Sequence, residues 1–316
     1  MAPESQTDAS PSLIALLCPG QGAQHVGMAK AWCEKSQAAR DTFERANDLL
    51  GYDLTTLCFD GPEDQLARTD RAQPAIYTAS VASYRGLLEA GEINPDHIAM
   101  TAGLSLGEFT ALHLAGALSF EDGLRLVDLR GKAMQDAAEA ADSSMVAITG
   151  DADEATINEL CDKARGDGVL VPANFNSPMQ VVISGSRDAC DRAVSVASEM
   201  GLKPTPLVVA GAFHSPLMAP AAERLSEALE QVSWSMPTRP VLSNVTGKPH
   251  DADAASIRQK LVDQLTSPVR WSQSMQLAAE RYSSSQFIEL APGKVLSGLM
   301  KRIDRSIKVQ NHAQPA

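Results

Sequence analysis

The stretch His97-Ile-Ala-Met-Thr-Ala-Gly-Leu-Ser-Leu-Gly-Glu108 joins a short apolar run to a serine bordered by glycines. The apolar run predicts a buried strand over 97–102, and the residues that follow predict a helix over 108–117. Between them, Gly103-Leu104-Ser105-Leu106-Gly107 fits the tight strand-to-helix turn called a nucleophile elbow. There the serine hydroxyl stands at a helix N-terminus, where backbone N–H groups stabilise a developing oxyanion. An ordinary glycine-bordered turn would match the same five residues, but the flanking strand and helix favour a nucleophile.

The segments around the elbow predict a larger α/β unit. Residues 13–18 form a second apolar run, which Pro19-Gly20-Gln21-Gly22 stops, and further strands are expected at 241–245 and 286–290. Helical patterns lie between these strands, at 30–50, 74–90, 121–140 and 217–231, and after the last of them, at 295–303. Short apolar strands alternating with helices are typical of a parallel sheet covered on both faces. We therefore expect a large α/β-hydrolase-like body with a short, mostly parallel sheet.

The residues from 142 to 206 carry a different pattern. Strands are expected at 145–149, 169–173, 180–184 and 205–209, with helices at 153–165 and 188–200. This β-α-β-β-α-β order is that of a ferredoxin-like unit. We therefore expect an inserted ferredoxin-like subdomain over 142–206, with the body formed by 1–141 and 207–316. The polar residues 1–11 and the tail 310–316 are expected to lie outside the folded core.

Composition and charge disfavour several classes of function. The 316 residues carry a net charge of −12, which disfavours binding to nucleic acid or to anionic membranes. The five cysteines are scattered and odd in number, which indicates free thiols in a reducing compartment. The sequence contains no recognisable metal-ligand cluster, signal peptide or membrane-spanning run. We expect a soluble, cytoplasmic protein that holds no metal.

A serine nucleophile needs a base, and histidine is the usual one. Of the six histidines, His214 lies in Gly211-Ala212-Phe213-His214-Ser215-Pro216, between a predicted strand and a predicted helix. Strand ends in open α/β sheets are where such folds place their active groups. We therefore favour His214 as the base over a capping or core role, although its spacing from Ser105 does not by itself bring the two together.

Five motifs occur in order along the chain. They are PGQGAQ at 19–24, GLSLGE at 103–108, RGKAMQ at 130–135, AFHS at 212–215 and QLTSPVRW at 264–271. Through these motifs, residues 13–305 resemble the malonyl-CoA:acyl carrier protein transacylases and the acyltransferase domains of fatty acid and polyketide synthases. The resemblance implies an acyltransferase that moves malonyl from malonyl-CoA to the phosphopantetheine thiol of acyl carrier protein, for fatty acid synthesis. It implies no bound cofactor, because the CoA thioester is the substrate, and we expect a monomer.

The resemblance also implies a role for each matching residue. Ser105 would carry the acyl group as an ester, and His214 would deprotonate first Ser105 and then the incoming thiol. The backbone carbonyl of Gln264 would orient the imidazole, so its side chain is expected to matter less. Gln21 and the N–H of Leu106 would form the oxyanion hole.

Arg130 is implied to select the acyl group. A guanidinium binds a carboxylate through two parallel hydrogen bonds, and malonyl has a free carboxylate where acetyl has none. Taken alone, Arg130 reads more naturally as a solvated residue on a helix surface, but the motif around it favours the carboxylate site. Met134 and Phe213 would line the acyl pocket. The combination of Leu106 and Phe213 accompanies malonyl rather than methylmalonyl in related acyltransferases, and the Phe213 ring would crowd an α-methyl group.

Leu104 departs from the family pattern, which usually has His before the nucleophilic serine, and this leaves rate and acyl preference open. Two other functions stay open as well. A serine hydrolase or thioesterase of the α/β-hydrolase type would need a late histidine, His250 or His312. A catalytically dead acyltransferase fold could act as a binding module, and only Leu104 points to it.

Overall fold

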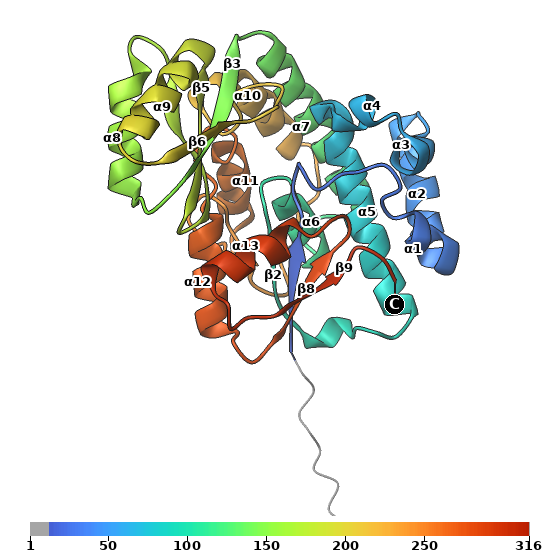
Figure 1. Cartoon of the computed structure of the whole chain (residues 1–316). Coiled ribbons are helices and arrows are strands. Elements are labelled where there is room, and N and C mark those ends of the chain that lie inside the picture. Colours follow the sequence, from blue (N-terminus) through green and yellow to red (C-terminus); the bar gives the residue numbers. More distant parts are fainter. Residues whose placement is uncertain (1–12, 316) are drawn as a thin grey trace, which may run out of the picture.

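Five parallel strands form the central sheet of the computed structural model, which describes residues 13–315 (Figure 1). Their order across the sheet is β7-β2-β1-β8-β9. Their bounds are Ile14–Cys18 for β1, Ile98–Gly103 for β2, Val241–Leu242 for β7, Gln286–Leu290 for β8 and Val309–His312 for β9. Every neighbouring pair runs parallel, with Cys18 beside Gly103 where β2 enters the elbow. The predicted parallel sheet is confirmed.

The central sheet is covered on both faces, which explains why its strands read as unbroken apolar runs. All five residues of β1 are buried, and they alternate between two hydrophobic clusters. Helices α5 (Thr69–Glu89), α6 (Gly107–Leu114) and α7 (Phe120–Glu139) contribute to the cluster on one face. Helices α12 (Trp271–Arg281) and α13 (Val295–Ile303) cover the other face.

Shorter helices complete this larger unit. The single helix predicted over 30–50 is two helices, α1 (Lys30–Lys35) and α2 (Gln37–Leu50). They separate at Ser36, whose backbone is extended and whose side chain caps α2 by accepting from the backbone N–H of Ala39. The others are α3 (Leu54–Asp60), α4 (Glu63–Ala67), α10 (Ala219–Leu229) and α11 (Ala254–Asp263), with short 3-10 turns at η1 (Pro95–His97) and η2 (Pro216–Met218).

The C-terminal segment corrects one prediction. Residues 310–316 were expected outside the folded core, yet β9 pairs with β8 from Val309 beside Phe287 to His312 beside Leu290. Trp32 Nε1 also donates to the His312 carbonyl at 3.0 Å. A short, polar edge strand has no apolar pattern of its own, so its partner defines it. The prediction for residues 1–11 falls outside the described residues.

A second sheet stands apart from the first and is wholly antiparallel. Its strands are β3 (Ser143–Thr149), β4 (Leu170–Ser177), β5 (Gln180–Ser186) and β6 (Lys203–Pro206), in the order β4-β5-β3-β6. Helices α8 (Glu154–Arg165) and α9 (Arg187–Glu199) pack on it around a separate hydrophobic cluster. The predicted element order is present. The last strand ends at Pro206, where 205–209 was predicted.

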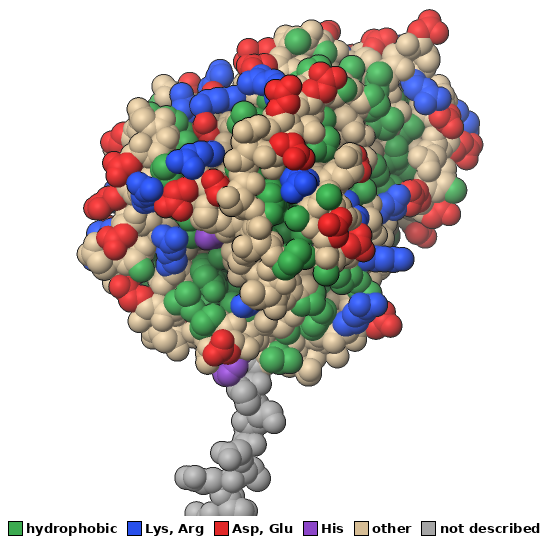
Figure 2. All heavy atoms as spheres, turned by 180° about the vertical axis from the view of Figure 1, so that it is seen from behind, with side chains coloured by type: hydrophobic (Ala, Val, Ile, Leu, Met, Phe, Trp, Pro, Cys, Tyr) green, Lys and Arg blue, Asp and Glu red, His purple; other side chains and the backbone are tan. Residues whose placement is uncertain are grey.

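The segment before α12 ties the two sheets together. Val269 exchanges backbone hydrogen bonds with Ala173 and Phe175 of β4, at 2.8 and 2.9 Å. Arg270 makes two hydrogen bonds of 3.0 Å to the Glu154 carboxylate on α8. Seen from behind, the surface carries acidic and basic side chains interspersed with one another (Figure 2). Among the described residues, no helix is both long enough and apolar enough to cross a membrane.

Candidate active site

Ser105 lies in the sharp turn between β2 and α6, with a backbone φ of +50°. The turn requires its glycines: a Cβ at Gly103 would come within 1.9 Å of the Gly107 backbone, and one at Gly107 within 2.2 Å of the Cys18 carbonyl oxygen. Asn244, just after β7, fastens the turn from the side. Its Oδ1 accepts from the Ser105 N–H at 2.6 Å, and its Nδ2 donates to the Gly103 carbonyl at 2.7 Å.

His214 lies beside Ser105 although 109 residues separate them in the chain. Its Nε2 is 2.8 Å from Ser105 Oγ, and its Nδ1 is 2.7 Å from the backbone carbonyl oxygen of Gln264. Because a carbonyl only accepts, Nδ1 carries the hydrogen and Nε2 accepts from the serine hydroxyl. Burial, and then the charge of Arg130, lower the pKa of His214 to about 4 against the opposing effect of the Gln264 carbonyl. The imidazole is therefore neutral near pH 7 and able to take a proton.

The Arg130 guanidinium reaches the same hydroxyl from α7. Its Nη2 donates to Ser105 Oγ at 3.0 Å and to Gln264 Oε1 at 2.8 Å, and its Nη1 donates to Gln73 Oε1 at 2.7 Å. Only 1% of Arg130 is exposed, so it is not a solvated surface residue. Burial lowers the pKa of Arg130 to about 10, opposed by the charge of Glu108, and the side chain stays cationic at pH 7.

Gln264 takes part through its side chain as well as its carbonyl. Its Nε2 donates to the Glu108 carboxylate at 2.5 Å and to the Ser105 carbonyl at 3.0 Å, while its Oε1 accepts from Arg130. The side chain of Gln264, which was expected to matter less than its backbone, thus has hydrogen-bond partners of its own. Sequence alone could not reveal them, because they depend on three distant segments.

The loop that follows β1 packs against the elbow. A Cβ at Gly20 would lie 2.2 Å from the Leu104 carbonyl oxygen, so the loop approaches as closely as backbone allows. Gln21, next in this loop, donates from its Nε2 to Thr69 Oγ1 at 3.2 Å. Leu106 is buried at the N-terminal end of α6. Of the two residues expected to form the oxyanion hole, Gln21 lines the same cleft as Ser105, and Leu106 follows Ser105 within the turn.

A cleft of about 580 Å³ opens over Ser105 and His214. Leu104, Met134 and Phe213 give it apolar walls, as expected for Met134 and Phe213. The antiparallel sheet contributes further lining from Met145, Asn174, Asn176, Gln180 and Val182. Substrate entering this cleft would therefore contact both units.

Sequence reasoning missed three polar residues around the elbow. Asn244 stands at the carboxyl end of a parallel strand, a position that could have singled it out. Glu108 is an acidic residue in the otherwise apolar stretch that opens α6, and it is fully buried. Gln73, on α5, has no local signal, since its contact with Arg130 exists only in the folded chain.

The two histidines that a hydrolase would need lie elsewhere. His250 Nε2 donates to Glu108 Oε1 at 2.6 Å, and His312 belongs to β9. The histidine that contacts Ser105 is His214. Within residues 13–315, no group of three or more His, Cys, Asp or Glu side chains is placed to hold a metal ion.

Comparisons with known proteins show which family the chain resembles. The family described as "acyl transferase domain" matches residues 15–314. A malonyl CoA-acyl carrier protein transacylase of Salmonella typhimurium is 42% identical over 304 residues, which are 96% of each chain. The crystal structure of the malonyl-CoA:acyl carrier protein transacylase from Xanthomonas oryzae pv. oryzae has a TM-score of 0.90 at 44% identity, covering 97% of this chain and 96% of that one. A structure of a type II PKS acyl-carrier protein in complex with its malonyl-transacylase matches with a TM-score of 0.90 at 38% identity, covering 96% of this chain and 97% of that chain.

Proposed function

This chain belongs to the acyl transferase family, and from that premise we propose that it transfers malonyl from malonyl-CoA to the phosphopantetheine thiol of acyl carrier protein. One observation carries the proposal: the Ser105 hydroxyl lies 2.8 Å from a neutral imidazole and 3.0 Å from a buried guanidinium. The first group activates the nucleophile, and the second matches the free carboxylate of the acyl group. The product would supply extender units for fatty acid synthesis.

The reaction takes place in two halves. Ser105 Oγ attacks the thioester carbonyl while His214 Nε2 takes the hydroxyl proton, and Gln21 with the Leu106 N–H stabilises the oxyanion. The carbon–sulfur bond then breaks, and CoA leaves with the proton from His214. In the second half His214 takes the proton of the carrier protein's thiol, whose sulfur attacks the ester. Ser105 regains a proton from His214 when the ester bond breaks, so the proposed steps use no bound cofactor.

Arg130 provides the selection for a dicarboxylic acyl group. Its planar guanidinium, which is buried and donates to neutral groups in the free protein, can bind the malonyl carboxylate through two parallel hydrogen bonds. Met134 and Phe213 line the space around the acyl chain, and Phe213 next to the base disfavours an α-methyl group. Leu104 supplies apolar lining where the family usually has His.

Intact mass spectrometry with malonyl-CoA tests the proposal directly. We expect a malonyl adduct on the wild-type enzyme and none on Ser105→Ala. Arg130→Ala should lower kcat/KM for malonyl-CoA by about a hundredfold more than for acetyl-CoA, since a charge-assisted hydrogen bond contributes about 1.5–3 kcal/mol. Equal losses with both thioesters would refute the carboxylate role. A wild-type protein that never acquires an adduct would support the inactive binding fold.

The finer description of the architecture is also a proposal. We describe the body (1–141 and 207–316) as α/β-hydrolase-like and the subdomain (142–206) as ferredoxin-like. The support is the strand-elbow-helix turn in the first and the β4-β5-β3-β6 order in the second. Strands β3 to β6 pair in a sheet of their own, one face of which packs on its own cluster while the other joins the cluster of the body.

We further propose that the enzyme acts as a cytoplasmic monomer. Its five cysteines are all free and buried, in agreement with a reducing compartment. Ser105, His214 and Arg130 come from one chain, so the proposed chemistry needs no second copy.

A further inference from the structure

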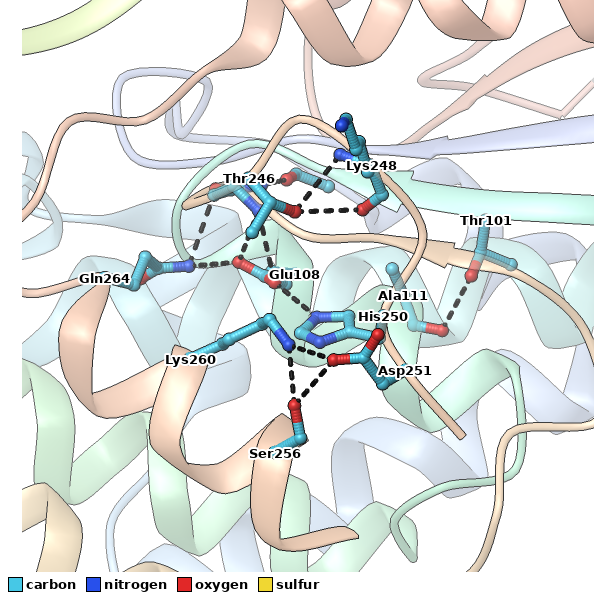
Figure 3. Close-up of polar contacts among 12 residues, drawn as sticks. Thr101, Glu108, Ala111, Thr246, Lys248, His250, Asp251, Ser256, Lys260 and Gln264 are labelled. Atoms are coloured by element: carbon cyan, nitrogen blue, oxygen red, sulfur yellow. Dashed lines mark hydrogen bonds and ion pairs between the residues drawn. The ribbon is translucent and has the colours of Figure 1, made fainter. Parts of the chain in front are cut away.

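Glu108 has a buried carboxylate that takes no part in the proposed reaction steps. Its Oε2 accepts from Gln264 Nε2 at 2.5 Å, and its Oε1 accepts from His250 Nε2 at 2.6 Å. Both oxygens also lie 3.3 Å from the backbone nitrogen of Asn244. Figure 3 shows Glu108 between Gln264 and His250, on the helix that follows the elbow. The carboxylate is thus held from several sides, away from the acyl site.

One side-chain amide joins this carboxylate to Arg130. Gln264 donates to Glu108 through Nε2 and accepts from Arg130 Nη2 through Oε1. The Nε2 group also faces the Ser105 carbonyl at 3.0 Å and Asn244 Oδ1 at 3.4 Å. All these neighbours are acceptors, so the amide has one favourable orientation, with its oxygen toward the guanidinium.

Glu108 and Arg130 form a pair of buried opposite charges without touching. They are 0% and 1% exposed, and an uncompensated buried charge is strongly destabilising. In direct contact, the carboxylate would occupy the guanidinium fork. The interposed Gln264 amide leaves Arg130 a counter-charge nearby without giving it a carboxylate partner.

We propose that Glu108 is a positioning residue, the counter-charge of Arg130 in the free enzyme, and that Gln264 holds it one side chain away, so that the guanidinium donates only to neutral groups, which the substrate carboxylate can replace. The inference rests on the proposed function, because it assumes a dicarboxylic acyl group. Malonyl then gains a direct charged partner without displacing one that belongs to the protein, whereas acetyl gains nothing.

Exchanging the two side chains tests this arrangement. The double variant Glu108→Gln/Gln264→Glu keeps composition and net charge, and it keeps the carbonyl at 264 that orients His214. It places the carboxylate directly against Arg130. We expect kcat/KM for malonyl-CoA to fall about ten- to hundredfold more than kcat/KM for acetyl-CoA. The loss should come mainly from a higher KM, because the carboxylate at position 264 already pairs with Arg130 and competes with the malonyl carboxylate.

Malonate binding, measured by isothermal titration calorimetry, reports the same contact without acyl transfer. Wild-type protein should bind malonate about ten- to hundredfold more tightly than the double variant. If the wild type binds malonate more tightly than the double variant but transfers no malonyl, the proposed function is wrong and the counter-charge assignment stands. Equal malonate affinities in the two folded proteins would overturn the assignment.

The single variant Glu108→Gln gives an independent measurement that does not require the exchange to fold. It keeps the shape of the side chain and removes its charge, so Arg130 lacks a counter-charge until an anion binds. Malonate should therefore raise the Tm of Glu108→Gln more than it raises the Tm of the wild type, and an equal or smaller rise contradicts the proposal. Asp251→Asn is the matched control. It removes the charge of Asp251, which pairs with Lys260 near His250 (Figure 3), and it should change neither the malonate affinity nor the rise in Tm that malonate causes.

Discussion

The Ser105 hydroxyl has two neighbours with different tasks. His214 accepts its proton, and Arg130 donates a hydrogen bond to the same oxygen. The positive charge of Arg130 also helps to keep His214 neutral, because two adjacent cations repel. A residue placed to recognise the substrate therefore also prepares the base.

This coupling predicts the pH dependence of acylation. The pKa of His214 is lowered from its ordinary 6.5 to about 4, and the imidazole can act only when it is unprotonated. The kcat/KM for malonyl-CoA should therefore stay level as pH falls from about 8 to about 5 and decline only near pH 4. Arg130→Met should move this decline to higher pH, because losing the neighbouring charge favours the imidazolium. Rapid-quench intact mass spectrometry measures both profiles, and a wild-type midpoint near 6.5 would contradict the prediction.

At the residue scale, the sequence identified the groups that carry short motifs. Ser105, His214 and Arg130 each stand within a recognisable string, and the fold brings them together. Glu108 and Gln73 were not predicted as site residues, because their roles depend on burial and on hydrogen-bond partners at least 57 residues away in the sequence. Local patterns do not encode such contacts.

At the scale of elements, the elbow is a close fit of three backbones. Gly107→Ala should be inactive and destabilised by about 3 kcal/mol, because its Cβ would lie 2.2 Å from the Cys18 carbonyl oxygen. Gly298→Ala in α13 is the matched control, since nothing lies within 4 Å of its Cβ position. The free energy of unfolding of this control should rise by about 0.5–1 kcal/mol. Urea unfolding measures both, and similar stabilities would show that β1 and the elbow can move apart.

Elements with a strong pattern of their own were predictable, and those defined by neighbours were not. The apolar runs of β1 and β2 were found because both faces of the sheet are covered. The edge strand β9 and helices α3, α4, α11 and α12 were missed. β9 is short and mostly polar, so its pairing with β8 creates it. The helix predicted over 30–50 broke at Ser36, where a capping side chain outweighs the helical periodicity on either side.

At the scale of the whole molecule, three hydrophobic clusters support one cleft. The antiparallel sheet has its own hydrophobic cluster, yet Val269 and Arg270 tie it to the segment that carries Gln264. Displacement of this sheet would therefore change the cleft wall and strain the support of His214.

A core mutation tests how independent the two units are. Ile183 is fully buried in the hydrophobic cluster of the antiparallel sheet, and Ile183→Ala should destabilise that unit by about 2–5 kcal/mol. Hydrogen exchange followed by mass spectrometry should show faster exchange across 143–206, with β1, β2 and β8 unaffected. Uniformly faster exchange in both sheets would mean that the chain unfolds as one unit and would contradict the proposed division.

The backbone at the two reacting residues has a consequence for how the protein balances stability against activity. Ser105 and His214 have φ values of +50° and +58°, a region that disfavours residues with a Cβ by about 1–2 kcal/mol. Ser105→Gly and Ser105→Ala should both be inactive, but the glycine variant should be more stable by about 1 kcal/mol in urea unfolding. Identical midpoints would mean that the turn relaxes around the larger residue. Selection for stability alone would favour glycine at both positions. The left-handed backbone at Ser105 and His214 therefore lowers stability in order to present the hydroxyl and the imidazole to each other.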